Sequence, residues 1–173
     1  MKNATTRLAA AVALATLALA AVPASFAAAL DPGDRAAEIG LADLHGRRIT
    51  LSALRGHVVI VDTWASWCGP CAAEFPVLES LYRRYAARGL VVVGVSADND
   101  ASNVQRFLSS HPASFPIVHD AAHSVLPRYN PQTMPSSYVI DKRGIVRYVH
   151  RGFEAGRDTA AFDHEVSVLL SLP

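Results

Sequence analysis

The chain has few cysteines, no excess of either charge and no repeats. Two of its 173 residues are cysteines, and 16 lysines and arginines stand against 15 aspartates and glutamates. A balance this close to neutral argues against nucleic acid or an anionic lipid surface as the main partner. Internal repeats are absent, and no low-complexity linker follows the N-terminal leader. The sequence therefore favours an ordinary globular protein with little thiol chemistry outside one site.

The first residues have the pattern of an export signal. Lys2 and Arg7 precede an apolar stretch over 8–22 that carries no charge, and Pro23 leads into small residues that end at Ala29. A basic start, a short apolar core and a small-residue end are typical of a secretory signal peptide. We predict an export signal over residues 1–29, cleaved after one of residues 27–29.

An uncleaved membrane anchor is the alternative interpretation of this segment. Residues 8–30 contain no charge and are long enough to span a bilayer, which needs roughly 20 apolar residues. Their alanine-rich composition and Pro23 favour cleavage. No cysteine lies near the junction, so a lipid-modified anchor is excluded. Either way the remaining residues 30–173 are exported, with the periplasm as the predicted location, and their length fits one domain.

The two cysteines lie close together, at Cys68 and Cys71. They follow the apolar run 58–61 and precede a helical pattern, which predicts a dithiol or disulfide at a helix N-terminus. There the helix dipole and the free N–H groups favour the thiolate, the attacking form of sulfur. A purely structural disulfide is the alternative, but such a small loop gains little unfolded-state entropy when it is closed.

Hydrophobic periodicity predicts strands and helices in alternation. The predicted strands cover 39–44 and 47–51 (a hairpin), 58–63, 90–95, 115–118, and 137–140 with 145–149 (a second hairpin). The predicted helices cover 68–88, a segment capped by Ser102, 121–129, and a final segment capped by Asp158 or Thr159. A strand–helix–strand order implies a parallel, right-handed crossover. We therefore predict an α/β fold with a central mixed sheet and helices on both faces.

The run from Val61 to Cys71, Val-Asp-Thr-Trp-Ala-Ser-Trp-Cys-Gly-Pro-Cys, resembles the active-site strand and helix start of the thioredoxin superfamily. The N-terminal hairpin, the continuation over 71–76 and an insert over about 98–126 are similar to the TlpA/ResA-like exported thiol–disulfide reductases. The resemblance covers residues 30–173. It implies a thioredoxin-like three-layer sandwich with an N-terminal β-hairpin extension and a mid-chain insert, without a cofactor and as a monomer.

The resemblance also implies roles for the thiols and for two acids. Cys68 would attack a substrate disulfide, and Cys71 would resolve the mixed disulfide. Asp62, six residues before Cys68, matches the buried acid of thioredoxins, and Glu74 matches the glutamate of the ResA-like group. Either acid could relay the proton of Cys71. The alternatives are a solvated first-turn residue for Glu74 and a hydrogen-bonded strand end for Asp62.

Five further residues are candidates for substrate binding. Pro135 matches the family's cis-proline, and a cis bond after Met134 would offer that residue's backbone to an extended substrate. Trp67 would cover the disulfide and, with Gly69 and Pro70, contribute to docking, whereas Trp64 is predicted to lie in the core. The local Thr-Met-Pro-Ser-Ser sequence over 133–137 departs from the Gly-Val-Pro-Glu-Thr type of cytochrome c maturation reductases, which weakens assignment to that branch.

These observations predict an exported reductase of protein disulfides that serves apocytochrome c or copper-site proteins and draws electrons from a membrane donor of the DsbD or CcdA kind. A disulfide oxidant or isomerase of the same fold is the nearest alternative. A peroxiredoxin is disfavoured because the P-x-x-x-T-x-x-C loop is absent. A copper metallochaperone binding through both thiols is a further alternative, but no metal site is expected: only His119 and His123 have ligand-like spacing, and both are predicted to be surface residues.

Overall fold

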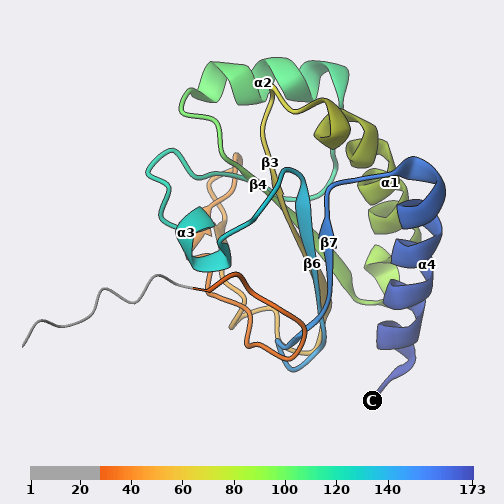
Figure 1. The fold of residues 1–173 in the computed structure, drawn as a ribbon. Helices are drawn as coiled ribbons and strands as arrows, with labels where there is room; N and C mark the ends of the chain where they lie inside the picture. Colours follow the sequence, from red (N-terminus) through yellow and green to blue (C-terminus); the bar gives the residue numbers. More distant parts are fainter. Residues whose placement is uncertain (1–27) are drawn as a thin grey trace, which may run out of the picture.

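The computed structural model describes residues 28–173. Its central sheet has five strands in the order β5-β4-β3-β6-β7, of which β3, β4, β6 and β7 are labelled in Figure 1. The predicted leader and its alternative as an anchor therefore lie almost wholly outside the described residues. The strands of the sheet are β3 (Val58–Trp64), β4 (Leu90–Ser96), β5 (Ile117–His119), β6 (Ser136–Ile140) and β7 (Val146–Arg151). The helices are α1 (Gly69–Tyr85), a 3₁₀ turn η1 (Ala86–Arg88), α2 (Ala101–Ser110), α3 (Leu126–Tyr129) and α4 (Ala155–Ser171).

The sheet is mixed, as predicted. Strands β3, β4 and β5 run parallel to one another, and β6 pairs antiparallel with both β3 and β7. The central strand β3 is buried along its whole length, which explains its continuous apolar sequence. Helix α1 forms the crossover between β3 and β4. It ends in η1 and then Gly89, whose φ of 100° lies in the left-handed region that glycine adopts without strain.

Two apolar clusters cover the two faces of the sheet. On one face Phe75 and Leu78 of α1 and Phe162 and Val166 of α4 pack against alternate residues of the strands. Figure 1 shows α1 and α4 side by side on that face. The other face is covered by the N-terminal segment and by the single turn of α3, which contributes Tyr129. The predicted three-layer thioredoxin-like arrangement is confirmed, with the second cover made mostly of extended chain.

The N-terminal hairpin is present but short. Strands β1 (Leu41–Ala42) and β2 (Arg48–Ile49) pair antiparallel, and Asp43 closes their turn by accepting backbone hydrogen bonds from His45 and Arg47, each 2.9 Å long. No helix within residues 28–173 is both long and apolar enough to cross a bilayer.

Three predicted helix boundaries are wrong, and each error involves an aspartate. Helix α2 is capped by Asp100, whose Oδ1 accepts from the Ser102 N–H. Only 126–129 of the predicted helix 121–129 is helical. Helix α4 starts at Ala155, and Asp158 accepts a hydrogen bond from the Glu154 N–H from inside the first turns.

Candidate active site

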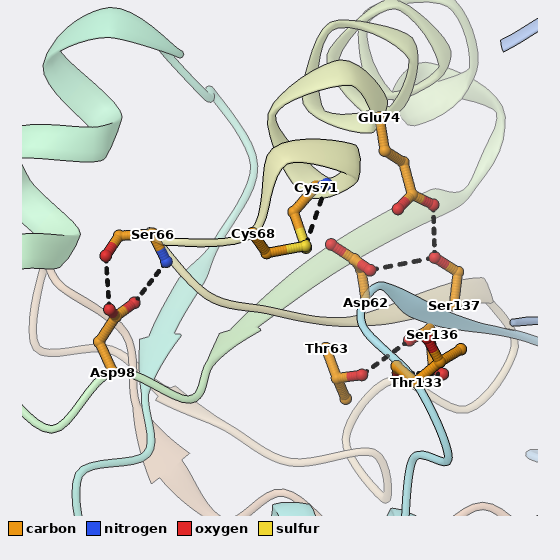
Figure 2. The surroundings of a disulfide bond; sticks show 10 residues. All are labelled: Asp62, Thr63, Ser66, Cys68, Cys71, Glu74, Asp98, Thr133, Ser136 and Ser137. Atoms are coloured by element: carbon orange, nitrogen blue, oxygen red, sulfur yellow. Dashed lines mark hydrogen bonds between the residues drawn. A yellow bond between two sulfur atoms is a disulfide. The ribbon is translucent and has the colours of Figure 1, made fainter. Parts of the chain in front are cut away.

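Cys68 and Cys71 form a disulfide at the N-terminus of α1, as Figure 2 shows. Cys68 is the N-cap residue, with an extended backbone (φ −91°, ψ 107°), and its Sγ accepts a hydrogen bond of 3.2 Å from the Cys71 N–H. Sulfur here takes the place of the oxygen with which a serine or aspartate would cap the helix. The thiol of Cys68 thus lies where free backbone N–H groups favour negative charge.

The two cysteine residues differ in accessibility. Cys68 is 6% exposed and Cys71 is fully buried, which is the order expected for an attacking and a resolving thiol. Gly69 and Pro70 occupy the first two positions of α1, where the missing N–H of proline removes no helical hydrogen bond. Of the two cysteines, only Cys68 has exposed surface that an external disulfide can approach.

Two buried carboxyls from different elements lie near this disulfide (Figure 2). Asp62 belongs to β3 and Glu74 to α1, and both are buried, with exposures of 0% and 1%. In Figure 2 they flank the hydroxyl of Ser137 on β6. The Oγ of Ser137 is 3.0 Å from Oδ1 of Asp62 and 2.6 Å from Oε1 of Glu74. The alternative that Glu74 is a solvated first-turn residue is therefore wrong.

Burial dominates the electrostatics of this pair. It raises the pKa of Asp62 to about 7, against the opposing effect of the Ser137 hydrogen bond. It also raises the pKa of Glu74 well above its ordinary value, and the neighbouring charge of Asp62 adds to the effect. Oδ2 of Asp62 and Oε2 of Glu74 are buried and have no hydrogen-bond partner within the described chain. Such unpaired oxygens favour the protonated form of a carboxyl.

The loop before Cys68 is held by Asp98, a residue that sequence analysis did not single out. The carboxylate of Asp98 is 2% exposed and accepts from the Ser66 N–H at 2.9 Å and from the Ser66 hydroxyl at 2.6 Å. A third hydrogen bond comes from the Ser96 hydroxyl at 2.8 Å. Asp98 therefore fixes the segment that carries Trp67 and Cys68. Its only sequence signal is its position just after a buried strand.

Replacing Asp98 with alanine is expected to destabilise the protein by about 3 kcal/mol, because several buried donors lose their acceptor. Urea unfolding of the oxidised protein measures the loss. Asp100→Ala is the matched control two residues away, since that exposed aspartate caps only α2. Equal losses from the two substitutions would contradict the role assigned to Asp98.

The predicted substrate-binding residues include a proline after a cis peptide bond and an exposed tryptophan. The peptide bond between Met134 and Pro135 is cis, as the resemblance implied. Trp67 is 72% exposed beside the buried sulfurs, whereas Trp64 is fully buried and packs against Phe75 and Phe107, with ring centroids 4.8 and 4.5 Å away. Trp67 thus presents an apolar surface next to the reachable edge of Cys68.

The two histidines with ligand-like spacing do not form a pair. His119 ends β5, and its Nε2 lies 2.7 Å from the carbonyl oxygen of Asp98. His123 lies in a turn, and its Nε2 contacts Oδ1 of Asn99 at 2.9 Å. Among residues 28–173 no group of three or more His, Cys, Asp or Glu side chains is arranged to hold a metal ion.

Comparison with known proteins gives consistent results. The model of the AhpC/TSA family matches residues 32–149. The thiol-disulfide oxidoreductase ResA of Halalkalibacterium halodurans is 35% identical over 120 residues, which cover 69% of this chain and 68% of the relative. ResA of Bacillus subtilis is 32% identical over 123 residues, covering 71% and 69%.

Solved structures show the same likeness. A Chlorobium tepidum protein described as a thiol:disulfide interchange protein DsbE is 35% identical and has a TM-score of 0.78, covering 83% of this chain and all of that one. A Bacteroides thetaiotaomicron protein described as a protein disulfide isomerase has a TM-score of 0.76 at 22% identity, covering 83% and 92%, and supports the fold alone.

Proposed function

Because the chain belongs to the AhpC/TSA family and is a thiol–disulfide oxidoreductase of thioredoxin-like fold, we propose that it reduces protein disulfides in the periplasm. The observation that supports this most is the pairing of one reachable sulfur, Cys68, with one buried sulfur, Cys71, at the N-terminus of α1. An attacking thiol must meet its substrate, while a resolving thiol must be kept from reacting with solvent species.

The proposed reaction has two exchange steps. The thiolate of Cys68 attacks a substrate disulfide; the substrate S–S bond breaks, a mixed disulfide forms, and the departing substrate sulfur takes a proton from water. Cys71 then loses its proton and attacks Sγ of Cys68. The Cys68–Cys71 bond forms, the mixed disulfide breaks, and the second substrate sulfur leaves as a thiolate that takes a proton from solvent. Two electrons pass from the cysteine pair to the substrate.

The buried acids are proposed to take the proton of Cys71. A fully buried thiol has no water beside it to accept the proton, so a protein group must do so. Asp62 and Glu74 are buried nearby. In Figure 2 the carboxyl of Asp62 lies between the disulfide and Ser137, and Glu74 reaches the Ser137 hydroxyl from α1. Burial raises the pKa of both acids, and that of Asp62 to about 7, so Asp62 can exchange a proton near neutral pH.

Docking is proposed to use Trp67 and the backbone of Met134. The exposed indole gives a protein substrate apolar contact area beside Cys68. The cis bond before Pro135 leaves the N–H and C=O of Met134 available for strand-like pairing with an extended peptide. Gly69 and Pro70, on the first turn of α1, complete this surface.

The direction of the reaction and its biological setting are also part of the proposal. The Gly69-Pro70 dipeptide is of the thioredoxin type and favours a reductant. The export pattern over residues 1–29, as a signal peptide or an anchor, supports action outside the cytoplasm, where a reductase needs electrons from a membrane donor of the DsbD or CcdA kind. Apocytochrome c and copper-site proteins are the proposed substrates, since both need free exported thiols.

A titration of the Cys68–Cys71 couple in redox buffers tests the direction. We expect a reduction potential near that of thioredoxin, about −270 mV. A potential near that of strong oxidants such as DsbA, about −120 mV, would instead support the oxidant or isomerase alternative.

Replacing Cys71 with alanine is expected to trap substrates on Cys68, because nothing remains to resolve the mixed disulfide. Non-reducing electrophoresis of periplasmic extracts, followed by reduction, measures the adducts. Cys68→Ala is the matched control and should capture none. Adducts on Cys68→Ala instead of Cys71→Ala would show that the two thiols have exchanged roles.

A further inference from the structure

Ser137 occupies the centre of a row of polar residues that crosses the sheet. In the strand register Asp62 of β3 lies opposite Ser137 of β6, and Ser137 lies opposite His150 of β7. Residues directly opposite one another in antiparallel strands share a face, and this face is the one covered by α1 and α4. Glu74 reaches the same hydroxyl from α1. Among residues 28–173, the Ser137 hydroxyl is thus the one that contacts both buried acids.

The number of hydrogens at this hydroxyl limits the protonation states of the acids. A serine hydroxyl carries one hydrogen, so it can donate to only one carboxyl. Its Oγ nevertheless lies within hydrogen-bond distance of both Asp62 and Glu74. If both acids were ionised, one carboxylate oxygen would face the Oγ lone pairs with no hydrogen between them. Both contacts are satisfied only when at least one carboxyl is protonated and donates to Oγ.

We propose that Ser137 is a positioning residue that joins Asp62 and Glu74 into one acid unit with a shared proton, and that this unit exchanges protons with Cys71. The inference rests on the proposed function for its second half. In the resting unit one carboxyl donates to Oγ of Ser137, and the serine hydroxyl donates to the other, which is ionised. A shift of both hydrogens along this chain moves the charge between Asp62 and Glu74 without moving a heavy atom.

The proton balance of the resolving step follows from this arrangement. The ionised carboxyl of the unit accepts the proton of the Cys71 thiol, and the resulting thiolate attacks Sγ of Cys68. The unit then holds two protons and returns one to solvent before the next cycle. Reduction of the disulfide by a dithiol donor runs the same transfer in reverse, with the unit protonating the departing Cys71 thiolate.

Other charged groups near the unit come from α4 and β7. Asp158 of α4 is close enough for its charge to help raise the pKa of Glu74. The imidazole of His150 points toward α4, with its Nε2 2.8 Å from Glu165 and its Nδ1 3.8 Å from Asp158. Asp158 is itself paired with Arg157, with Nε and Oδ1 2.8 Å apart. These groups have partners of their own, so the hydroxyl of Ser137 is the direct link between the two acids.

The test is a pH titration of the oxidised protein, in which neither cysteine carries a titratable thiol. The probe is the carboxyl carbon resonance of Asp62 and of Glu74 in ¹³C-labelled protein, each assigned by its loss in Asp62→Asn or Glu74→Gln. In the native protein we expect two widely separated steps that belong to the pair. Because the hydroxyl stabilises the singly protonated state, Ser137→Ala is expected to raise the midpoint of the lower step and to lower the midpoint of the upper step by about one pH unit or more.

Two further variants separate this effect from a general disturbance of β6. Ser136→Ala makes the same change one residue away, at a serine whose hydroxyl donates to the Thr133 carbonyl oxygen at 2.8 Å, and it should leave the upper midpoint unchanged. Ser137→Thr keeps a hydroxyl and should restore the native midpoint. An unchanged midpoint in Ser137→Ala would overturn the proposal, as would an equal shift in Ser136→Ala or a lack of rescue by threonine.

Thiol exchange by the reduced variants supplies the second readout. The resolving rate should rise with pH as the singly protonated unit forms, which is the lower step of the pair. The pH at which this rate reaches half its maximum should therefore increase in Ser137→Ala, together with the lower carbon midpoint, and return in Ser137→Thr. A shift in the titration without any shift in the rate profile would overturn the link to Cys71. The carbon titration needs no substrate, so failure of the native protein to reduce disulfides would count against the proposed function and not against the shared proton.

Discussion

Replacing Cys68 with serine is expected to lower the rate of disulfide reduction by about 10³-fold or more, the scale seen when a catalytic nucleophile is removed. A serine hydroxyl keeps its proton at neutral pH and cannot form a disulfide. The buried Cys71 cannot compensate, because its side chain has no exposed surface. The rate is measured with a small chromogenic disulfide and an excess of a dithiol reductant.

Cys71→Ser is the matched control for this experiment. It makes the same chemical change at the second thiol and should keep one stoichiometric reaction with the chromogenic disulfide, because Cys68 can still attack. The expectation for Cys68→Ser is contradicted if that variant keeps a rate within tenfold of the native protein. Such a result would place the attacking sulfur at Cys71, in spite of its burial.

Replacing Asp62 with asparagine is expected to stabilise the oxidised protein at pH 8 by about 2 to 4 kcal/mol. The pKa of Asp62 is about 7 in the folded protein, against about 4 in an unfolded chain. Between these values the folded state binds more protons than the unfolded state, so the native protein loses stability as pH rises from about 4 to about 7. Asparagine has no proton to lose, so its advantage should be present at pH 8 and absent at pH 4.

Urea unfolding at the two pH values measures this difference. Asp34→Asn makes the same exchange at an exposed residue and controls for the substitution itself. A stability gain for Asp62→Asn that is equal at pH 4 and pH 8 would contradict the burial of an ionising carboxyl at this position. The gain at pH 8 should come with slower thiol exchange, because the site then lacks one of its two acids. Stability would increase at the expense of function.

The parts of the fold that follow from local pattern were predicted well. The apolar run from Val58 is the central strand β3, and the helical pattern after Cys68 is α1, ended by Gly89 as expected. The second hairpin lies at β6 and β7, joined through the turn that begins at Asp141. These elements have sequence periods and turn residues that specify them without help from distant parts of the chain.

The errors occur where an aspartate side chain replaces a helical hydrogen bond. Asp120 accepts hydrogen bonds from the backbone N–H groups of Ser124, Val125 and Leu126. These bonds organise a turn over the segment predicted as the start of a helix. At α4 the carboxylate of Asp158 accepts a hydrogen bond from the backbone N–H of Glu154, which lies four residues earlier in the chain. A capping aspartate looks the same in sequence whether it precedes the helix or lies within it.

The residues of the candidate site that belong to short sequence motifs were predicted. The contacts between site residues that lie far apart in the chain were not. The cysteine pair, the cis bond before Pro135 and the two acids all follow from the resemblance of short motifs. The bridging position of Ser137 depends on the antiparallel register of β3 and β6, which brings together residues 75 positions apart. The hydrogen bonds from Ser66 to Asp98 likewise join two loops across the parallel strands. Neither contact has a local sequence signal.

The register of β6 has a consequence for how this protein tolerates insertions and deletions. Side chains alternate between the two faces of a strand, so losing or gaining one residue between Pro135 and Ser137 would turn the serine toward the opposite layer. After the loss of a residue, the bulky ring of Tyr138, which now packs with Tyr129 on that layer, would be forced between the two acids. Length variation in this part of the chain should therefore be confined to the turn beyond Ile140, where added residues do not change the register of β6.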